Sequence, residues 1–423
     1  MKLAVIGAGI IGITTAYELA ADGHEVTVFE RRSAAAEETS FANAGVVAPG
    51  YVTPWAAPGM PGKVFSHLFS RHAPVKISLP LSSSELAWMW KWYQACKLPT
   101  YLANRARMQR LAFYSRERLH QLTAALQLDY DRSAGYMVLL RTHKDHQLVQ
   151  PGLQVLRDTG VAFGEITASQ ARTIEPALNP DTSFAGAIHL PHDEVANCRQ
   201  FALLLKNQAQ RLGVKFEFNQ AVGQLNPAQP ASLLVAGEAT PRRFDGIVIC
   251  AGLASARLLQ LLGLKIPMVA VYGYSISAPI RESLNAPRSA LMDERYKVAI
   301  SRLGQRVRVA GSAEIGGSLG LKRAASIQTL YKVLHDWFPG AVQHAPLGAH
   351  VQEWKGARPM LPDGPPVIGN SGMAGVWLNV GHGSSGWALS CGSARVLANL
   401  MAGKNPDIDM EGLGIARLGI RLA

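Results

Sequence analysis

The first thirty residues constrain the fold of this 423-residue chain more than any other stretch. The apolar run 2–6 is typical of a strand that is buried on both faces, and a Gly-x-Gly-x-x-Gly segment follows it directly at 7–12. The next residues, 13–21, have the pattern of a helix, and 24–29 predict a second strand that ends at Glu30. Strand, glycine turn, helix, strand and acid in this order predict a unit that binds a dinucleotide.

Each glycine of this segment has its own expected role. Gly7 permits the tight turn, Gly9 lets the backbone approach a pyrophosphate, and Gly12 allows the helix to lie close to the strand. The N–H groups and the positive dipole end of the helix then face phosphate oxygens. Glu30 is placed to accept hydrogen bonds from ribose hydroxyls.

The bulk composition is that of a globular protein. Apolar residues make up 48% of the chain and charged residues 17%, and the length allows two structural units. The longest apolar stretches, near 246–262 and 374–391, are interrupted by glycine or by Arg257, so we expect no membrane-spanning segment. Acidic residues come too early for a secretory signal. We therefore expect a cytoplasmic protein, with peripheral contact on the inner face of the cell membrane left open.

The cysteines and histidines do not form the pattern of a metal site or a disulfide framework. The cysteines are scattered and contain no Cys-x-x-Cys pair, which predicts free thiols in a reducing compartment. His143 and His146 lie in a polar stretch that a solvated turn explains. We therefore predict that the protein binds no metal.

The formal net charge of +12 is compatible with nucleic acid, anionic lipid, or an anionic cofactor and substrate as partners. The basic residues are dispersed, and their local clusters are not interleaved with aromatic residues as in a strand-binding platform. We therefore favour a membrane-surface or substrate-attracting role and expect no nucleic acid as a partner.

The rest of the chain shows two kinds of pattern. Parallel-sheet patterns like those of the first thirty residues return near 190, whereas 266–312 alternates like a mixed sheet and is followed by a helix at 323–337. We therefore predict an α/β protein with a discontinuous Rossmann-like domain and a second α+β domain, which binds the substrate on a mixed or antiparallel sheet. The first domain would comprise 1–82, 187–265 and 345–423, and the second 83–186 and 266–344.

Two local predictions concern the middle of the chain. A strand at 187–191 leads to a helix at 198–212, which Asp193 or Asn197 could cap. A strand that begins at Gly213 is expected to continue to Leu225.

Three tryptophans open a helical region at 84–128. Trp88, Trp90 and Trp92 alternate by two, so they cannot share one helical face. At least one of them is expected on an exposed or partner-contacting surface.

A second strand–turn–helix pattern lies near the end of the chain. The strand 376–380 is followed by a glycine-rich turn at 381–386 and a helix at 387–402. The start of this helix supplies positive potential, which suits the edge of an anionic ring.

Together these segments resemble the FAD-dependent amino-acid oxidoreductases of the glycine/D-amino-acid oxidase superfamily, and more narrowly the bacterial D-amino acid dehydrogenase family. The resemblance covers nearly the whole chain. The segments that carry it are VIGAGIIGITTAYELA (5–20) with Glu30-Arg31-Arg32, TSFANAG (39–45), PWAAPGMPGK (54–63), WMWKW (88–92), RMQRLAFYSRERL (107–119), YGYSI (272–276), WKGARPMLPDGPPVIG (354–369) and GHGSSGWALSCGSARVLANLMAG (381–403).

The resemblance implies FAD as the cofactor and assigns residues to its two ends. The ADP half would be held by Gly7, Gly9, Ile10, Ile11, Gly12, Glu30 and Arg31, with Val222 clamping the adenine through its backbone and Gly252 nearby. The flavin would lie near Ser40, Asn43, Ala44 and Gly45, with Gly381, His382, Gly383 and Ser384 against its pyrimidine edge.

The resemblance also implies a substrate site. Arg358 in the Gly-Ala-Arg-Pro motif would grip the substrate carboxylate, because a guanidinium can bind a carboxylate in a bidentate manner; the alternative is a surface ion pair. Tyr274 and Tyr272 are hydroxyl donors that could share the carboxylate, with packing as the alternative. His382 or solvent would take the proton of the substrate ammonium.

Two departures from the family pattern leave the preferred substrate open. Family members commonly have a lysine where this chain has Tyr272. They also have a Thr-Gly-Asp run where this chain has Val195-Ala196-Asn197.

The predicted reaction is FAD-dependent oxidation of a D-amino acid by hydride transfer to the flavin, with water then giving a 2-oxo acid and ammonia. The electrons would pass to a quinone or another acceptor that is not oxygen. The alternatives are a D-hydroxyproline or D-proline dehydrogenase, an oxidase that uses O₂, a flavin-dependent tRNA-modifying domain, and a non-catalytic flavoprotein that acts as a binding module.

Overall fold

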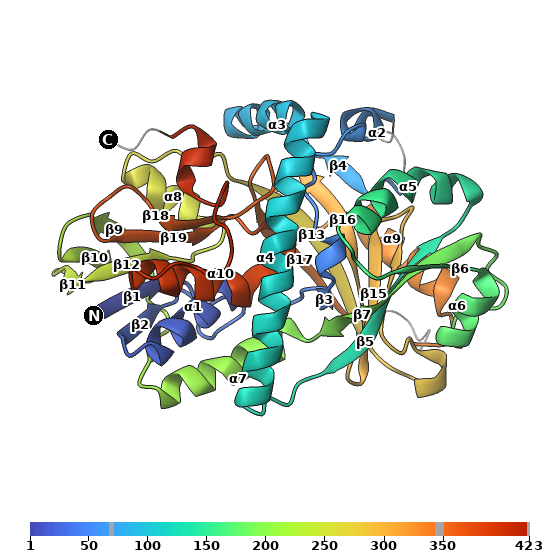
Figure 1. The fold of residues 1–423 in the computed structure, drawn as a ribbon, viewed down its shortest axis with the longest axis horizontal. Helices are drawn as coiled ribbons and strands as arrows, with labels where there is room; N and C mark the ends of the chain where they lie inside the picture. Colours follow the sequence, from blue (N-terminus) through green and yellow to red (C-terminus); the bar gives the residue numbers. More distant parts are fainter. Residues whose placement is uncertain (67–71, 343–350, 421–423) are drawn as a thin grey trace.

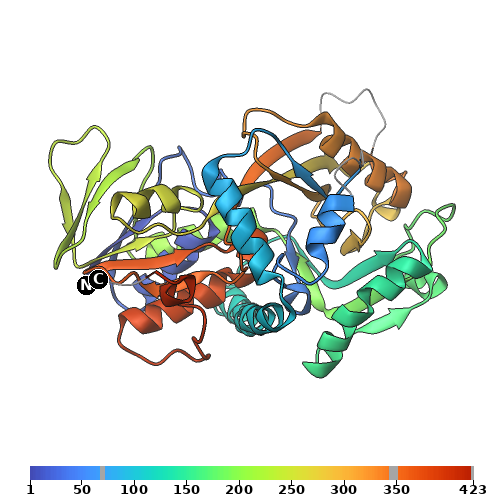
Figure 2. The ribbon, with the colours of Figure 1, turned by 90° about the horizontal axis from the view of Figure 1, so that it is seen from above.

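The structure, a computed structural model, describes residues 1–66, 72–342 and 351–420. A six-stranded sheet lies at one end of its long axis and a ten-stranded sheet at the other, with the helix α4 (Leu98–Ala125) crossing between them (Figures 1 and 2). The predicted fold class, a Rossmann-like α/β half with a second mixed sheet, is confirmed. The predicted domain boundary at 344/345 lies outside the described residues.

The six-stranded sheet is centred on the first strand of the chain. Its order is β18-β19-β12-β1-β2-β8, and all neighbours pair in parallel except β18, which is antiparallel to β19. Helices or other layers cover both faces, which is why β1 and β12 are nearly continuous apolar runs. The strands are β1 (Lys2–Ile6), β2 (Glu25–Phe29), β8 (Lys215–Glu217), β12 (Gly246–Ile249), β18 (Val367–Asn370) and β19 (Val376–Val380).

One face of this sheet shares a hydrophobic core with four helices, α1 (Ile10–Ala21), α7 (Cys198–Arg211), α10 (Gly386–Met401) and α4. The prediction placed α4 in the second domain, but its buried residues share a core with α1 and α10. The contact is close because Gly392 of α10 faces α4, where a Cβ would lie 2.8 Å from the Cα of Ser115. This shared core places α4 with the dinucleotide half.

The other face of the six-stranded sheet packs on a small antiparallel sheet and on α8 (Ala254–Leu261). The small sheet consists of β9 (Val222–Asn226), β10 (Ala231–Val235) and β11 (Arg242–Phe244). The prediction of one strand from Gly213 to Leu225 is therefore wrong. The chain leaves the six-stranded sheet after β8. Asn219, which follows β8, has a left-handed φ of 58°, a conformation that interrupts a strand.

The ten-stranded sheet has the order β17-β13-β16-β15-β14-β5-β7-β3, with β4 beside β16 and β6 beside β7. Its strands are β3 (Val46–Val47), β4 (Val75–Ile77), β5 (Arg132–Leu140), β6 (Gly164–Ile166), β7 (Gly186–Ala196), β13 (Val269–Pro279), β14 (Ala290–Asp293), β15 (Val298–Leu303), β16 (Arg306–Ile315) and β17 (Gln352–Met360). The helix α9 (Ala324–Trp337) packs against one face of β13, β15 and β16. Strands β3, β4, β7 and β17 belong to this sheet, although the predicted boundaries placed them in the dinucleotide domain.

The segment around 187–198 differs from its prediction in length. The strand β7 runs through Asp193 to Ala196, so Asp193 lies within a strand and cannot cap a helix. Asn197 is the N-cap of α7, and its side chain accepts a hydrogen bond from the backbone N–H of Gln200.

The remaining helices surround the sheets. They are α2 (Met60–Ser66), α3 (Ser83–Ala95), α5 (His143–Asp158) and α6 (Ala168–Ile174), with short 3₁₀ turns at η1 (Pro49–Tyr51), η2 (Ser283–Asn285), η3 (Gly383–Ser385) and η4 (Ile415–Leu418). The predicted division of the tryptophans is found in α3, where Trp88 is buried and Trp90 is 63% exposed. Within the described ranges, no helix combines the length and apolar character needed to cross a bilayer.

Candidate active site

The glycine turn between β1 and α1 has the geometry that the sequence predicts. Gly7 has a φ of 105°, and a Cβ there would lie 2.7 Å from the carbonyl oxygen of Cys250. A Cβ on Gly12 would lie only 1.8 Å from the carbonyl oxygen of Gly7, so this glycine lets α1 start against β1. Gly252 follows the neighbouring strand β12 at the same edge and has open space beside it. The turn thus leaves the start of α1 uncrowded.

Glu30 lies beside this turn at the carboxyl end of β2. Its Oε2 accepts a hydrogen bond of 2.7 Å from the N–H of Ala8, and its Oε1 accepts one from the N–H of Arg32. The chain after β8 runs next to it, because the N–H of Gln220 donates to the carbonyl of Glu30. Val222 begins β9 two residues later, which places both predicted adenosine-binding positions at one edge. Arg31 is different, because it is half-exposed and forms an ion pair with Glu38.

The loop at 39–45 connects the glycine turn to the ten-stranded sheet. The hydroxyl of Ser40 accepts a hydrogen bond from the N–H of Ile10 at the start of α1, while Ile11 is partly buried in the next position. The hydroxyl of Thr39 donates to the carbonyl of Ala357 in β17, at 2.7 Å. This loop therefore spans from the start of α1 to the strand that carries Arg358.

Two hydrogen bonds that involve side chains hold the end of the same loop. The Oδ1 of Asn43 accepts a hydrogen bond from the N–H of Gly45, and its backbone carbonyl accepts one of 3.0 Å from Arg308 in β16. Ala44 lies between these two residues and is partly exposed. Gly45 has a φ of 84° and leads into β3, where the chain joins β7.

The glycine-rich turn after β19 reaches the other side of β17. His382 forms an isolated β-bridge with Met360, and a Cβ on Gly383 would lie 2.7 Å from the sulfur of Met360. A Cβ on Gly381 would lie 2.5 Å from Leu361. Ser384 follows within the short turn η3, before α10 begins. The two ends of the chain therefore meet at β17, within three residues of Arg358.

The ring of His382 is buried in the protein. Its Nε2 lies 3.1 Å from the hydroxyl of Ser393 in α10, and burial lowers the pKa of the imidazole to about 3. The ring is therefore neutral near neutral pH, and it is too weakly basic to hold a proton taken from a substrate ammonium. The backbone of this turn, rather than the imidazole, is the part that suits a ring edge.

Arg358 lies on one face of the ten-stranded sheet, which we call the site face. The guanidinium rests on Gly273 of β13, where a Cβ would lie 2.3 Å from Nη2, and Nη1 donates to the carbonyl of Ser312 at 3.0 Å. Burial lowers the pKa of Arg358 to about 10. Among the described residues, no carboxylate forms an ion pair with this guanidinium, so its charge is available to a carboxylate ligand.

The site face is directed toward the dinucleotide half. Residues that alternate along a strand share one face, and Arg308 lies on the same face as Gly273 through the pairing of Ser277 with Arg308. The contact of Arg308 with the carbonyl of Asn43 therefore connects this face to the 39–45 loop. Burial lowers the pKa of Arg308 to about 10 as well.

Tyr272 and Tyr274 lie on the opposite face, so the structure does not bring them together with Arg358. Tyr274 is buried in the core that includes α9, and its hydroxyl donates to Glu314 and accepts from the N–H of Arg323. The ammonium of Lys355 lies 4.5 Å from the ring centroid of Tyr272. A strand turns successive side chains to opposite faces, so the residue of this segment that faces the site is Gly273.

These tyrosines belong to a buried ionic cluster around Glu314. Lys355 donates to Glu314 at 2.7 Å and to the carbonyl of Leu321 at 2.8 Å. Burial alone would raise the pKa of the Glu314 carboxyl. Hydrogen bonds from Lys355, Ser78 and Tyr274 outweigh this effect and lower that pKa. Lys355 thus places an ammonium against the ring of Tyr272, the position where the family commonly has a lysine.

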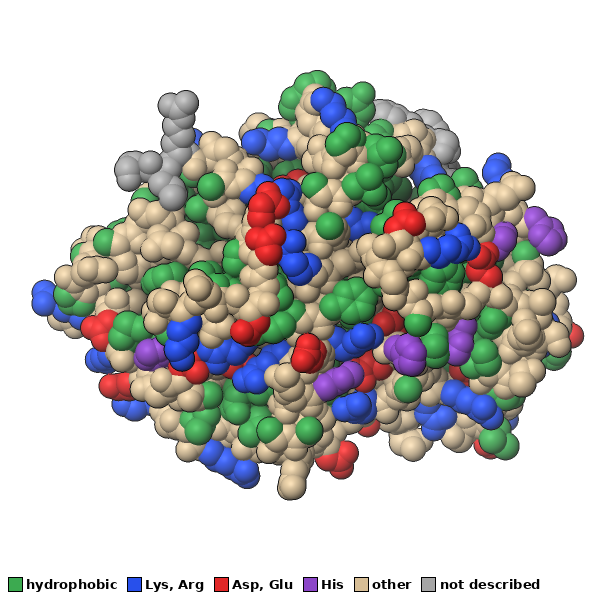
Figure 3. Space-filling model, in the orientation of Figure 1, with side chains coloured by type: hydrophobic (Ala, Val, Ile, Leu, Met, Phe, Trp, Pro, Cys, Tyr) green, Lys and Arg blue, Asp and Glu red, His purple; other side chains and the backbone are tan. Residues whose placement is uncertain are grey.

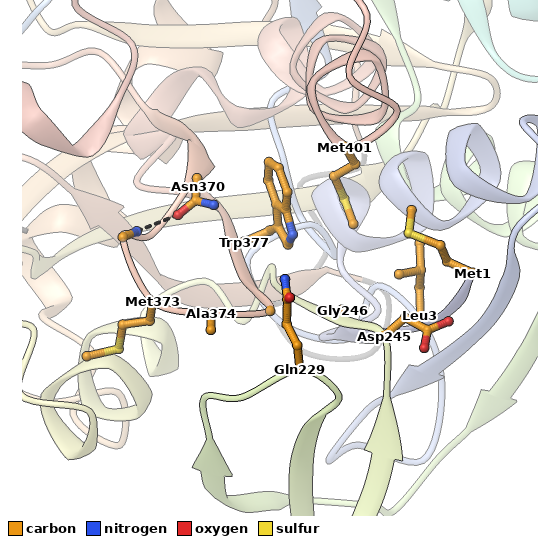
Figure 4. Close-up of a pocket in the computed structure, with 12 residues that line it drawn as sticks. Met1, Leu3, Gln229, Asp245, Gly246, Asn370, Met373, Ala374, Trp377 and Met401 are labelled. Carbon is orange, nitrogen blue, oxygen red and sulfur yellow. Dashed lines mark hydrogen bonds between the residues drawn. The ribbon is translucent and has the colours of Figure 1, made fainter.

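A pocket of about 460 Å³ lies elsewhere, at the amino ends of β1, β12 and β19 (Figure 4). Leu3, Trp377 and Met401 line it, and the side chain of Asn370 accepts a hydrogen bond from the N–H of Gly372 beside it. Ligands of open α/β sheets bind at the carboxyl ends of the strands, which is the opposite edge. This pocket is therefore separate from the dinucleotide and substrate sites.

Two residues of the site were missed from the sequence. Gly273 supports the guanidinium, and Arg308 places a second cation on the site face. The glycine between two tyrosines in the 272–276 segment was an available signal, because an interior strand glycine often marks a close approach. Arg308 carries no signal of this kind.

Comparison with known proteins agrees with this geometry. A family described as FAD dependent oxidoreductase matches residues 2–400. A D-amino acid dehydrogenase of Bradyrhizobium diazoefficiens is 41% identical over 425 residues and covers all of both chains. One of Cereibacter sphaeroides is also 41% identical, over 99% of this chain and 95% of its own.

Solved structures share the fold at low sequence identity. L-proline dehydrogenase from P. horikoshii has a TM-score of 0.75 at 15% identity and covers 99% of this chain and 97% of its own. Glycine oxidase from Geobacillus kaustophilus has a TM-score of 0.72 at 21% identity and covers 98% of both chains. These structures show that the arrangement of the two sheets is a known one.

The residues of the dinucleotide edge fit FAD. The cradle at Gly7 and Gly12 would be filled by any Cβ, the first turn of α1 contains no acidic residue, and Glu30 offers carboxylate oxygens at the end of β2. Three findings therefore indicate the same family: the match over residues 2–400, the full-length relatives and the geometry of this turn. The chain belongs to the FAD dependent oxidoreductase family and is an oxidoreductase whose cofactor is FAD.

Proposed function

We propose that this flavoenzyme oxidises D-amino acids to 2-oxo acids and ammonia and passes the electrons to a quinone or another non-oxygen acceptor. The observation that carries the proposal is the unpaired guanidinium of Arg358, within three residues of the place where both ends of the chain meet. The names of the two relatives, at 41% identity over nearly full length, support the D-amino acid as the substrate class.

In this proposal the protein acts by positioning the substrate. Arg358 binds the carboxylate through its free N–H groups, and Gly273 and the carbonyl of Ser312 fix the guanidinium plane. Bound FAD supplies the acceptor for the hydride from the substrate α-carbon. On one side, Trp88 of α3 packs near Val271 and Met360, and its indole N–H donates to the carbonyl of Met360 at 2.9 Å, which closes that side to water.

The substrate ammonium must lose a proton before the α-hydrogen leaves as hydride. His382 is unsuited to this step, because burial lowers its pKa to about 3 and its ring faces Ser393. Solvent is therefore the proposed proton acceptor. Within the described residues, no group of three or more histidines, cysteines and acids could hold a metal ion.

The test is anaerobic mixing of the FAD-loaded enzyme with single D- and L-amino acids, followed by the visible absorbance of the flavin. The proposal predicts bleaching by D-amino acids and none by their L-enantiomers. Reoxidation then separates the acceptors: a ubiquinone analogue or a dye should restore the colour quickly, whereas rapid restoration by O₂ with release of hydrogen peroxide would identify an oxidase.

The surface of α3 supports a second proposal, contact with a lipid membrane. Leu86, Trp90 and Tyr93 lie at i, i+4 and i+7 and are 56%, 63% and 54% exposed, and the rings of Trp90 and Tyr93 stack at 5.9 Å. Exposed lysines, Lys91 and Lys97, flank them. In Figure 3 apolar side chains gather at the top of the view, where Figure 1 places α3 and the start of α4. Aromatic rings with flanking lysines suit an anionic bilayer surface.

Vesicle sedimentation tests this contact. Vesicles that contain phosphatidylserine should bind the holoenzyme, and the double variant Trp90→Ser, Tyr93→Ser should lose most of that binding while activity on the free substrate stays the same. Leu284→Ser is the matched control, because Leu284 is 84% exposed and lies outside α3. Equal binding of wild type and double variant would refute the surface.

A further inference from the structure

The site face contains a stretch without side chains at its centre. Gly273 of β13 and Gly356 of β17 pair directly, so they occupy neighbouring positions on the same face of the antiparallel ladder. A Cβ on Gly273 would lie 2.3 Å from Nη2 of Arg358. The two glycines therefore form a flat surface, and the guanidinium of Arg358 covers the Gly273 half of it.

Trp354 covers the other half of this surface, at Gly356. This residue lies two positions before Gly356 on β17, so it faces the same side as Gly356 and Arg358. A Cβ on Gly356 would lie 1.5 Å from Cη2 of Trp354 and 2.2 Å from its Cζ3. The six-membered part of the indole therefore rests directly on the backbone of Gly356, and Trp354 is only partly buried.

We propose that Trp354 contacts the substrate side chain and selects D-amino acids whose side chains are apolar or aromatic. The inference rests on the proposed function, because it takes Arg358 as the carboxylate anchor. Directly paired residues of a sheet are about 5 Å apart, which is the distance over which an amino acid extends from its carboxylate to its side chain. A substrate held at the guanidinium thus presents its side chain to the indole.

The charges of the site face favour an apolar side chain over a cationic one. Arg358 and Arg308 both lie on this face, and neither forms an ion pair with a described carboxylate. Once Arg358 has paired with the substrate carboxylate, Arg308 remains as an unpaired cation, which repels a lysine-like or arginine-like substrate side chain. An indole ring offers apolar contact area without charge, so the pair of guanidinium and indole matches one carboxylate and one apolar group.

The two glycines provide matched variants that separate the two contacts. Gly356→Ala displaces Trp354, whereas Gly273→Ala displaces Arg358. We expect Trp354→Ala and Gly356→Ala to lower kcat/KM for D-leucine and D-phenylalanine about tenfold more than for D-alanine, because a lost apolar contact changes discrimination by roughly 10–200-fold. Gly273→Ala should lower kcat/KM for all three substrates by a similar factor. Gly152→Ala is the control, since a Cβ there has no neighbour within 4 Å.

A double variant tests whether Gly356 acts through the indole. In the Trp354→Ala background, Gly356→Ala should change the ratio of D-leucine to D-alanine kcat/KM by less than twofold, because its effect is already present. If Gly356→Ala changes this ratio as much in the Trp354→Ala background as in the wild type, its effect does not pass through the indole, and the role of Trp354 is contradicted. Trp354→Phe, which keeps a smaller apolar ring, should recover part of the preference for D-leucine.

Binding of non-reacting carboxylates gives a readout that does not depend on turnover. Benzoate and acetate are titrated into the holoenzyme, and the change in flavin absorbance reports the Kd. Trp354→Ala should weaken benzoate about tenfold and leave acetate within twofold, whereas Gly273→Ala should weaken both. An equal loss for benzoate and acetate, or no loss for either, would overturn the role of Trp354. If Arg358→Lys changes the Kd of neither ligand, the carboxylate anchor of the proposed function fails instead.

Discussion

Replacement of Arg358 by methionine should raise the stability of the protein while removing its substrate affinity. The guanidinium is desolvated on the site face, it donates one hydrogen bond to Ser312, and no described carboxylate pairs with it. An unpaired cation in this position costs folding free energy, and a bound substrate carboxylate offsets that cost. The same side chain is therefore unfavourable in the free enzyme and essential in the complex.

The magnitudes follow from the pKa of Arg358, which burial lowers from 12.5 to about 10. This difference corresponds to a desolvation cost of about 3 kcal/mol. The lost hydrogen bond to Ser312 returns about 1 kcal/mol of it, so Arg358→Met should increase the free energy of unfolding by about 2 kcal/mol. Loss of the charge pair with a carboxylate should cost about 2–5 kcal/mol of binding, which raises KM about 30-fold to several thousand-fold.

Thermal unfolding of the holoenzyme and benzoate titration measure the two effects on the same samples. The wild type should unfold at a higher temperature when benzoate is added, whereas Arg358→Met should start higher and gain nothing from benzoate. A variant that is less stable than the wild type, or that keeps the wild-type Kd for benzoate, would contradict the role of Arg358 as an unpaired buried cation that binds the substrate carboxylate.

Three further predictions concern the cofactor edge and the buried histidine. Glu30→Ala should lose FAD on gel filtration, while Glu25→Gln, at the exposed start of the same strand, should keep it; equal flavin content would contradict the ribose assignment. Gly12→Ala places a Cβ 1.8 Å from a carbonyl oxygen and should cost about 1–3 kcal/mol of stability together with FAD affinity, whereas Gly62→Ala has open space and should cost neither. The pKa of His382 is about 3 in the folded protein and about 6.5 in the unfolded chain, so the unfolded chain takes up a proton at a higher pH. The free energy of unfolding should therefore fall as the pH drops from 7 to 4. His382→Gln should remove about 3 kcal/mol of that loss in urea unfolding at pH 4, and an unchanged pH dependence would contradict the burial of a neutral ring.

The dinucleotide half was predictable because its signals are local. The turn at Gly7 and Gly12, the acid at the end of β2 and the strand–turn–helix at 376–402 each lie within one short stretch, and each has a specific physical requirement. These predictions depended little on distant parts of the chain.

The substrate site was predicted less well because it depends on which face of a strand each residue occupies. The segment 272–276 has an aromatic or apolar residue at most positions, so its sequence does not reveal which set is buried against α9. Tyr274 was expected beside Arg358, but it faces Glu314 instead, and the glycine between the tyrosines faces the site. A shift of one residue along a strand changes the face and therefore the function.

The long helix α4 illustrates a different limit. Its apolar residues are interspersed with arginines and polar residues, so the sequence alone did not indicate that it packs on α1 and α10. Ion pairs complete that contact, because Arg118 of α4 and Arg395 of α10 both bind the buried carboxylate of Glu18 in α1. Such a cluster comes from three segments that are distant in the sequence, and only the fold brings them together.

We propose that FAD lies where the two ends of the chain meet, within reach of a carboxylate held by Arg358. The most direct measurement is anaerobic addition of D-leucine and L-leucine to FAD-loaded wild type and Arg358→Met. We expect the flavin colour to be lost with D-leucine in the wild type and to persist in the other three mixtures. Protein that takes up no FAD, or flavin that D-leucine bleaches equally fast in the variant, would contradict it.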